Sequence, residues 1–216
     1  MVVGLVRSVN VGTPREAGWA VIGRTSIDKA AVSGPVRVGR QGLEGDQVSD
    51  TRHHGGPDQA VYAYSREELD WWSAQLGDPL RDGEFGENLT TCGIDVDEAE
   101  VGERWRIGTA LLEVASVRTP CNDFKSWMGR GGHDNGAWVR RFAERGRPGA
   151  YLRVLDPGVL TAGDLIEVVH RPGHGVTVSI MFRALMGEPE LLPRLLAVQR
   201  LAARVRRRVE TVATDR

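Results

Sequence analysis

The fold is decided by the segment Arg104-Trp105-Arg106-Ile107-Gly108-Thr109-Ala110-Leu111-Leu112-Glu113-Val114-Ala115-Ser116-Val117. Its parts 104–107 and 110–117 have strand length and are rich in apolar and β-branched residues. Gly108-Thr109 between them suits a tight turn, because Gly adopts the backbone conformations that such turns require. The segment therefore predicts a β-hairpin.

Runs of the same kind recur on both sides of this hairpin, separated by Gly, Pro and Asp. The 27 glycines lie well above the average frequency of roughly 7% and form no repeat, which is typical of proteins with many turns. Asp156-Pro157-Gly158 is expected to be one such turn, with Gly at positive φ. We predict a mainly β protein, a barrel or sandwich of hairpins, whose further strands cover 2–9, 36–38, 60–64, 88–91, 150–154 and 165–170.

Two segments interrupt the strands with helical patterns. Ser65 followed by Glu68 is a capping-box signature, and the helix that begins there should end before Gly77. The segment 136–145 carries apolar residues at helical spacing and stops at Gly146. We expect both to be surface helices packed on the barrel.

The composition changes after Arg171-Pro172-Gly173, where Leu, Ala, Met and Arg replace the strand-forming residues. We predict a small three-helix unit there. Thr177 caps a helix that runs to Met186, Gly187-Glu188-Pro189 breaks it, and helices follow over 190–198 and 200–212. The chain is thus expected to consist of a β-barrel over 1–172 and a helical extension over 173–216.

Counted from Arg171, the C-terminal part is basic, with nine arginines against four acidic residues, although Lys+Arg 28 and Asp+Glu 29 leave the whole chain at a net charge of -1. This excess suits either an arm that binds nucleic acid or a partner, or a solvated helix face. The solvated face is favoured, because no aromatic residue interleaves with the arginines. Nucleic acid is not expected as the main partner.

The remaining global features place the chain in the cytoplasm. No run approaches the ~18 apolar residues of a transmembrane helix, and the N-terminus lacks the basic flank and cleavage site of a signal peptide. Cys92 and Cys121 are too few for a disulfide framework and too distant for a CxxC motif. We expect a soluble protein with reduced thiols and no membrane partner.

The first loop with residues suited to chemistry lies within 45–64. It holds Asp46, Arg52 and Asp58 together with His53-His54-Gly55-Gly56, whose glycines let the backbone approach a ligand such as phosphate or a metal. An ordinary turn is the alternative. Zinc is not favoured, because adjacent histidines on an extended chain point in different directions.

Two further loops carry candidates. In 83–89, Asn88 offers an amide that both donates and accepts hydrogen bonds. After Val117, Pro120 ends the strand and delivers Cys121 close to Arg118. Nearby positive charge favours the thiolate, which binds soft metals, but a free Cys is as readily a small buried hydrophobe. Both interpretations of Cys121 stay open on chemistry alone.

Taken together, these loops resemble the MOSC domain family, named for the C-terminal domain of molybdenum-cofactor sulfurases, and within it the stand-alone bacterial YiiM type. The resemblance covers about residues 1 to 170, and the helical tail is similar to the three-helix extension of that type. It rests on Gly45-Asp46, His53-His54-Gly55-Gly56-Pro57-Asp58-Gln59-Ala60-Val61, Phe85-Gly86-Glu87-Asn88-Leu89-Thr90-Thr91, Val101-Gly102-Glu103 and Arg118-Thr119-Pro120-Cys121.

The resemblance implies a MOSC-type β-barrel that binds a molybdenum cofactor, with Cys121 as the protein thiolate on the metal. It also implies an oxidoreductase that reduces N-hydroxylated compounds such as hydroxylaminopurines. Beside Cys121, Asp46 and Asp58 are candidates for moving protons. The predicted cofactor-binding residues offer cations, backbone N–H groups or an amide, and they are Arg52, His53, His54, Gly55, Gly56, Asn88 and Arg118.

The electrons for this activity would come from an external donor protein, because no GxGxxG fingerprint follows a strand. The basic tail is one candidate docking surface for it, and a homodimer is also open. A competing hypothesis is a non-redox module that holds the cofactor or carries sulfur as a Cys121 persulfide, since related domains accompany pyridoxal-phosphate desulfurases. A third is a structural β protein with a partner-binding tail, which predicts no effect of replacing Cys121 and His54 by Ala.

Overall fold

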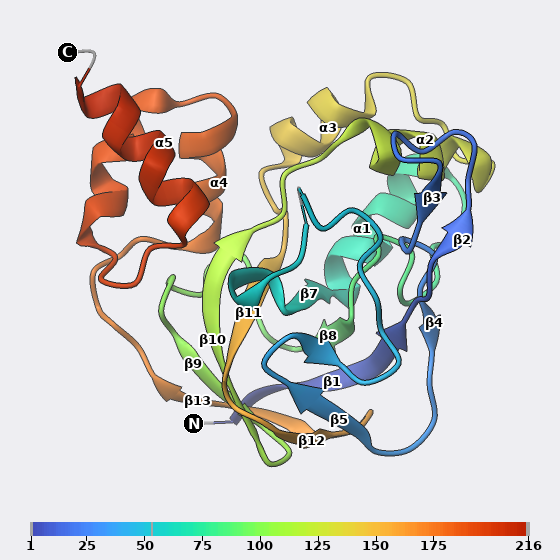
Figure 1. Ribbon diagram of the computed structural model, residues 1–216, viewed down its shortest axis with the longest axis horizontal. Helices are drawn as coiled ribbons and strands as arrows, with labels where there is room; N and C mark the ends of the chain where they lie inside the picture. The colour runs from blue at the N-terminus through green and yellow to red at the C-terminus, as the bar shows by residue number, and fades with distance from the viewer. Residues whose placement is uncertain (1, 53, 215–216) are drawn as a thin grey trace.

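The computed structural model describes residues 2–52 and 54–214, and a closed sheet forms its centre (Figure 1). The order of the eight strands in this sheet is β13-β9-β10-β11-β7-β8-β1-β4, and a further pairing of β13 with β1 closes it into a barrel. The predicted mainly β barrel is thus confirmed. The strands are β1 (Val2–Val11), β4 (Ala30–Ala31), β7 (Val61–Ser65), β8 (Leu89–Cys92), β9 (Arg104–Ile107), β10 (Ala110–Val117), β11 (Ala150–Asp156) and β13 (Leu165–His170).

The hairpin of β9 and β10 has the bounds that the sequence predicts. The two strands pair antiparallel, with Trp105 opposite Leu112 and Ile107 opposite Ala110. These four side chains are fully buried. The hairpin therefore supplies one wall of the hydrophobic core, as its apolar residues require.

The barrel is not a simple meander, because β7 and β8 run parallel. A parallel pair needs a crossover connection, and here α1 (Arg66–Leu76) provides it. Ser65 caps this helix: its hydroxyl accepts a hydrogen bond from the Glu68 N–H at 3.2 Å. The other half of the predicted capping box is not formed, because the Glu68 carboxylate pairs with Arg145 and Arg147 instead.

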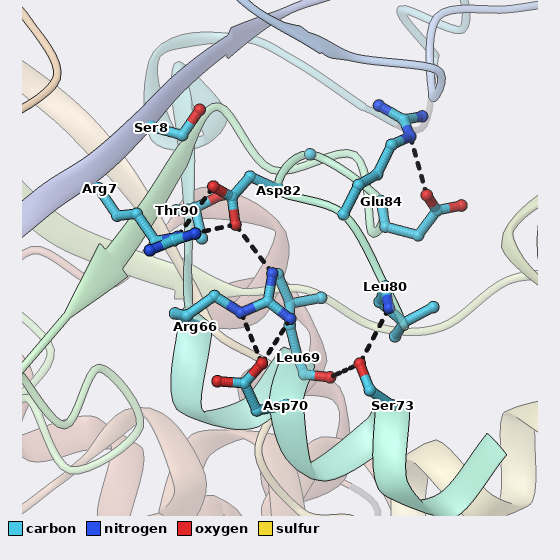
Figure 2. Close-up of polar contacts among 12 residues, drawn as sticks. Arg7, Ser8, Arg66, Leu69, Asp70, Ser73, Leu80, Asp82, Glu84 and Thr90 are labelled. Carbon is cyan, nitrogen blue, oxygen red and sulfur yellow. Dashed lines mark hydrogen bonds and ion pairs between the residues drawn. The ribbon is translucent and has the colours of Figure 1, made fainter. Parts of the chain in front are cut away.

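Polar contacts hold the chain between α1 and β8 (Figure 2). Asp82 accepts hydrogen bonds from Arg7 of β1 at 3.0 Å and from Arg66 at 2.8 Å. The Ser73 hydroxyl donates to the Leu69 carbonyl at 2.7 Å and accepts from the Leu80 N–H at 2.9 Å. This connection leads directly into the loop 83–88, so the same contacts fix one border of the site described below.

Two further helices, α2 (Asn122–Arg130) and α3 (Trp138–Arg145), cover the barrel beside α1. The segment 136–145 thus contains the predicted helix, whereas α2 was not expected. Both helices bury aromatic rings against Phe85, whose ring centroid lies 5.0 Å from that of Phe124 and 5.7 Å from that of Trp138. This aromatic cluster anchors the start of α2, where Cys121 lies.

Short elements lie outside the barrel sheet. The strands β12 (Gly158–Leu160), β5 (Val36–Gly39) and β6 (Gly42–Leu43) form one small sheet, β2 (Arg15–Glu16) and β3 (Arg24–Thr25) form another, and a 3-10 helix, η1 (Pro57–Gln59), precedes β7. The prediction of a positive φ at Gly158 is wrong, since this residue opens β12 and pairs with Val38 of β5. Gly is required there by close packing: a Cβ at Gly158 would lie 2.5 Å from the backbone nitrogen of Ala110.

The tail consists of α4 (Val178–Met186), the 3-10 helix η2 (Pro189–Ala197) and α5 (Ala203–Thr214). Thr177 caps α4 as predicted, accepting a hydrogen bond from the Ile180 N–H at 3.3 Å. The second predicted helix is instead η2, because Pro193 lies inside the segment, where its ring clashes with the carbonyl four residues earlier in an α-helix and it has no N–H to donate. α5 begins later than expected, at Ala203.

The tail packs on the barrel rather than standing apart from it (Figure 1). Val178 of α4 donates a backbone hydrogen bond to Ala99, and the ring of Phe182 lies 6.1 Å from that of Phe142. Buried residues of barrel and tail form one continuous hydrophobic cluster. The division into 1–172 and 173–216 rests on the change in composition and stays a prediction. It does not correspond to two separate hydrophobic cores. Among the described residues, no helix has the length and apolar character needed to cross a membrane.

Candidate functional site

One cavity brings together most of the predicted site residues. It lies between the segment 24–29, which begins with β3, the segments 41–50 and 54–60, and the connection from β10 to α2. Figure 1 shows the loop before β7 between the tail helices and the β2–β3 hairpin. The predicted residues that line this cavity are Asp46, His54, Gly55, Asn88, Arg118 and Cys121.

Cys121 occupies the residue position immediately before helix α2. Its backbone is extended, with φ -135 and ψ 172, and its side chain makes no capping hydrogen bond. The thiol is free and half-buried. The first N–H groups of a helix lack partners within the helix and carry partial positive charge. The sulfur therefore lies at the positive end of α2 and faces the cavity.

Arg118 is the most unusual side chain of the cavity. It is only 7% exposed, and its guanidinium carbon lies 5.2 Å from the ring centroid of Tyr62 and 4.8 Å from that of Phe124. Its Nε is buried and has no hydrogen-bond partner among the described residues. Burial acts to lower the pKa of Arg118, but Tyr151, Tyr62 and Cys121 raise it above its ordinary value. The Arg118 guanidinium is thus a charged group surrounded largely by aromatic rings.

Asp46 also lines the cavity, in a buried ion pair with Lys29. Asp46 also accepts hydrogen bonds from the Gly12 N–H and from the Asn88 side chain, both at 2.8 Å. Burial lowers the pKa of Lys29, although Asp46 acts to raise it. The pair places an amine and a carboxylate, which can exchange a proton, on the wall of the cavity.

Asn88 has a structural role in addition to its place in the lining. Its side-chain oxygen accepts from the Tyr62 N–H at 3.0 Å, and its nitrogen donates to Asp46 and to the Asn10 carbonyl at 3.3 Å. Both donor hydrogens of the amide are therefore used within the protein. Asn88 positions Asp46 and ties β7, β8 and β1 together.

The other predicted residues lie in a neighbouring cleft. Arg52, Gly56 and Asp58 line it, whereas His53 lies outside the described residues. The Asp58 carboxylate accepts two hydrogen bonds from Arg153, at 2.9 Å and 2.6 Å. The structure thus places Asp46, but not Asp58, among the residues that line the cavity together with Cys121. His54 and Gly55 border both cavities.

Sequence reasoning missed several residues of the cavity, above all Lys29, Gln59, Tyr62 and Tyr151. Lys29 comes from an N-terminal loop with no motif around it, so only the fold reveals its place beside Asp46. Tyr62 and Tyr151 lie on neighbouring strands and pair in register, a relation that the strand assignment alone does not give. The side-chain oxygen of Gln59 is buried without a partner.

The donor set of the cavity is poor in protein metal ligands. Among the described residues, no group of three or more His, Cys, Asp or Glu side chains is placed to hold a metal ion. A metal at Cys121 would therefore have to bring most of its ligands with it. Arg118 and Gln59 add an unused donor and an unused acceptor, so the cavity suits an organic group with its own polar edges and anionic parts.

Comparison with known proteins supports a family assignment. The model of the MOSC domain matches residues 50–167. The chain is 32% identical to the uncharacterized protein YflK of Bacillus subtilis over 82% of its length and 79% of that protein. It is 30% identical to a protein of Gibberella moniliformis named reductase, over 78% of its length and 30% of that protein. The crystal structure of YiiM from Geobacillus stearothermophilus superposes with a TM-score of 0.79 at 26% identity, covering 96% of this chain and 98% of that one. The chain therefore belongs to the MOSC domain family and is of the YiiM type.

Proposed function

We propose that the protein is an oxidoreductase that binds a molybdenum cofactor and reduces N-hydroxylated compounds, such as hydroxylaminopurines. The family assignment and the relative named reductase support this class of activity. The observation that carries the proposal is the combination, in one cavity, of a half-buried free thiol, Cys121, and a buried guanidinium, Arg118, whose Nε has no hydrogen-bond partner among the described residues.

The residues of the cavity fit such a cofactor. Cys121 would be the thiolate ligand, because molybdenum accepts soft sulfur donors and the pterin brings the other sulfurs itself. The Arg118 Nε–H would donate to an anionic or carbonyl oxygen of the cofactor, which would satisfy its missing hydrogen bond. Gln59, with an unpartnered oxygen, would accept from an amino group.

The chemistry divides between cofactor and chain. When bound, the cofactor would supply the two-electron chemistry that cleaves the N–O bond. In the net reaction a hydroxylamine takes up two protons and two electrons and gives an amine and water. The electrons would come from an external donor protein. The protons would pass through the Lys29–Asp46 pair, in which the lowered pKa of the amine eases proton release.

We also propose that the protein works in the reducing cytoplasm, since Cys92 and Cys121 are both free thiols. Oxidation of Cys121 to a disulfide or sulfenic acid would remove the thiolate that the proposed activity needs.

The test is reduction of 6-hydroxylaminopurine by protein purified from a cofactor-replete host, with a reduced viologen dye as electron source. We expect turnover by the parent, loss of turnover in Cys121→Ser, and full turnover in the control Cys92→Ser, because Cys92 does not line the cavity. A folded, cofactor-loaded parent without turnover would contradict the proposal. Intact mass showing one added sulfur on Cys121 in that parent would then favour the sulfur-carrier alternative.

A further inference from the structure

A second cleft adjoins the cavity, and arginines from two separate segments surround it. One wall is the loop 51–59, and the other is the beginning of α5 with the end of β10. Arg52 extends from the loop, and Arg204, Arg207 and Arg208 extend from the helix. We call this the arginine cleft. It joins a part of the barrel to the basic tail, for which the family assignment gives no role.

Three arginines of the cleft have no acidic partner in the part of the chain that the structure describes. In the described part of the chain, Arg52, Arg207 and Arg208 form no ion pair with an acidic side chain. Arg145, Arg153 and Arg183, in contrast, each have a carboxylate within 2.7 Å. The one carboxylate among the lining residues described, that of Asp58, is taken by Arg153 at 2.6 Å. Arg52, Arg207 and Arg208 therefore present positive charge to the cleft without a carboxylate partner among the described residues.

The arginine cleft is continuous with the proposed catalytic cavity. His54, Gly55 and Gln59 line both. The strand end 117–119 separates them, since Val117 and Thr119 face the cleft and Arg118 faces the cavity. This alternation follows from the two-residue period of an extended chain. A ligand that passes His54 and Gln59 could occupy both spaces at once.

We propose that the arginine cleft binds the phosphate of a nucleotide substrate, so that the protein acts on nucleoside monophosphates rather than on free bases. The proposal rests on the proposed function, because it takes the base end of the ligand to be the N-hydroxylated group in the cavity. Guanidinium groups from two walls suit a phosphate dianion, which accepts several charge-assisted hydrogen bonds.

The other lining residues suit the rest of such a ligand. Val117, Ala202 and Val205 give the cleft an apolar floor, on which a sugar can lie. Thr119 adds a hydroxyl. Gln59 lines both cleft and cavity, so it borders any ligand that spans the two. A free base would leave the arginines unused.

The test is calorimetric binding of adenosine 5′-monophosphate, adenosine and inorganic phosphate to the purified full-length chain, which needs no molybdenum. We compare the parent with Arg207→Ser/Arg208→Ser. The matched control is Arg194→Ser/Arg206→Ser, which removes the same charge from the tail at residues that do not line the cleft. We expect the monophosphate to bind more tightly than adenosine, and the cleft variant to weaken it by roughly tenfold or more. The control should bind like the parent.

Three results would overturn the proposal: equal affinity for the monophosphate and adenosine, equal losses in the cleft variant and the control, or a single-stranded oligonucleotide that binds far more tightly and is lost with the same arginines. Turnover is then compared between 6-hydroxylaminopurine and its riboside monophosphate in loaded protein. A preference for the monophosphate that disappears in the cleft variant supports the proposal. Equal turnover of the two substrates refutes the cleft's role but does not contradict the proposed reductase activity.

Discussion

Two buried arginines on neighbouring parts of the barrel wall have opposite surroundings. Arg153 of β11 and Arg118 after β10 are each 7% exposed. Arg153 is fully paired: it contacts Asp58 at 2.6 Å and Glu113 at 2.7 Å, and Glu113 also pairs with Arg104 at 3.0 Å. Arg118 lies between aromatic rings, with its Nε unpaired.

The difference separates structural from functional charge. A buried charge is costly unless it is paired. Arg153 meets this condition through its ion pairs with Asp58 and Glu113, so its role is structural. Arg118 forms no ion pair with a carboxylate among the described residues; aromatic rings and Tyr151 surround its guanidinium instead, and its Nε has no hydrogen-bond partner there. A group that lacks its partner in the free protein gains most from a ligand that supplies one, so the two regions should respond to mutation in opposite ways.

The largest effect is expected for Arg153→Met. This change leaves Asp58 and Glu113 as buried or half-buried carboxylates with one cation fewer, so the free energy of unfolding should fall by about 3 kcal/mol. Urea unfolding measures it. Arg153→Lys, which keeps the charge but not the fork of donors, should lose less. A loss below that of a surface substitution would mean that the network is not structural.

Glu87 is a buried acid for which the described residues form no ion pair, and it extends the comparison to the pH dependence of stability. Burial raises the pKa of Glu87 to about 7, although hydrogen bonds from Thr90, Gly83 and Phe85 act to lower it. In the unfolded chain this carboxyl has its ordinary pKa of 4.5, so it loses its proton at a lower pH than in the folded protein. The stability that the protonated Glu87 contributes is therefore present below about pH 4.5 and lost as the pH rises through about 7.

We expect the free energy of unfolding to fall, by an amount on the order of 2 kcal/mol for this group, between about pH 4.5 and about pH 7.5. Asp97, whose pKa burial also raises to about 7, should add a decline of the same sign. Unfolding of the parent and of Glu87→Gln across this range separates the two groups. An identical decline in both proteins would show that Glu87 does not titrate as described.

The smallest effect on stability is expected for Arg118→Met. The change breaks no ion pair with a carboxylate of the described residues and removes only contacts with aromatic rings and Tyr151, so the free energy of unfolding should fall by about 1 kcal/mol or less. Retention of molybdenum and pterin should nevertheless fall, because the donor for the cofactor is lost. If Arg118→Met were as destabilising as Arg153→Met, the contrast between the two arginines would be void.

The sequence predicts those parts of the fold that local chemistry determines. The hairpin of β9 and β10 has its predicted bounds because apolar alternation and Gly108 act within a few residues. α2 was missed because Pro120 and Gly129 mask its start and end, although Phe124, Trp127 and Met128 have helical spacing. The 3-10 form of η2 follows from Pro193, a signal that was present in the sequence but not used.

The candidate site was predictable only in part, for a related reason. Loops with Gly, His and Cys stand out in the sequence, and most of the residues proposed from them line one cavity. Partners are set by the fold: Lys29 reaches Asp46 across seventeen positions, and Arg153 reaches Asp58 across ninety-five. The unpaired state of Arg118 is likewise visible only once its neighbours are known.

The central claim is that Cys121 holds a molybdenum cofactor in the cavity beside Arg118. Its most direct test is the molybdenum and pterin content per chain of protein from a cofactor-replete host, with Cys121→Ser and the control Cys92→Ser prepared in parallel. We predict near-stoichiometric metal and pterin in the parent and in Cys92→Ser, and loss of both in Cys121→Ser. Folded parent protein without cofactor, or equal cofactor in all three proteins, would contradict it.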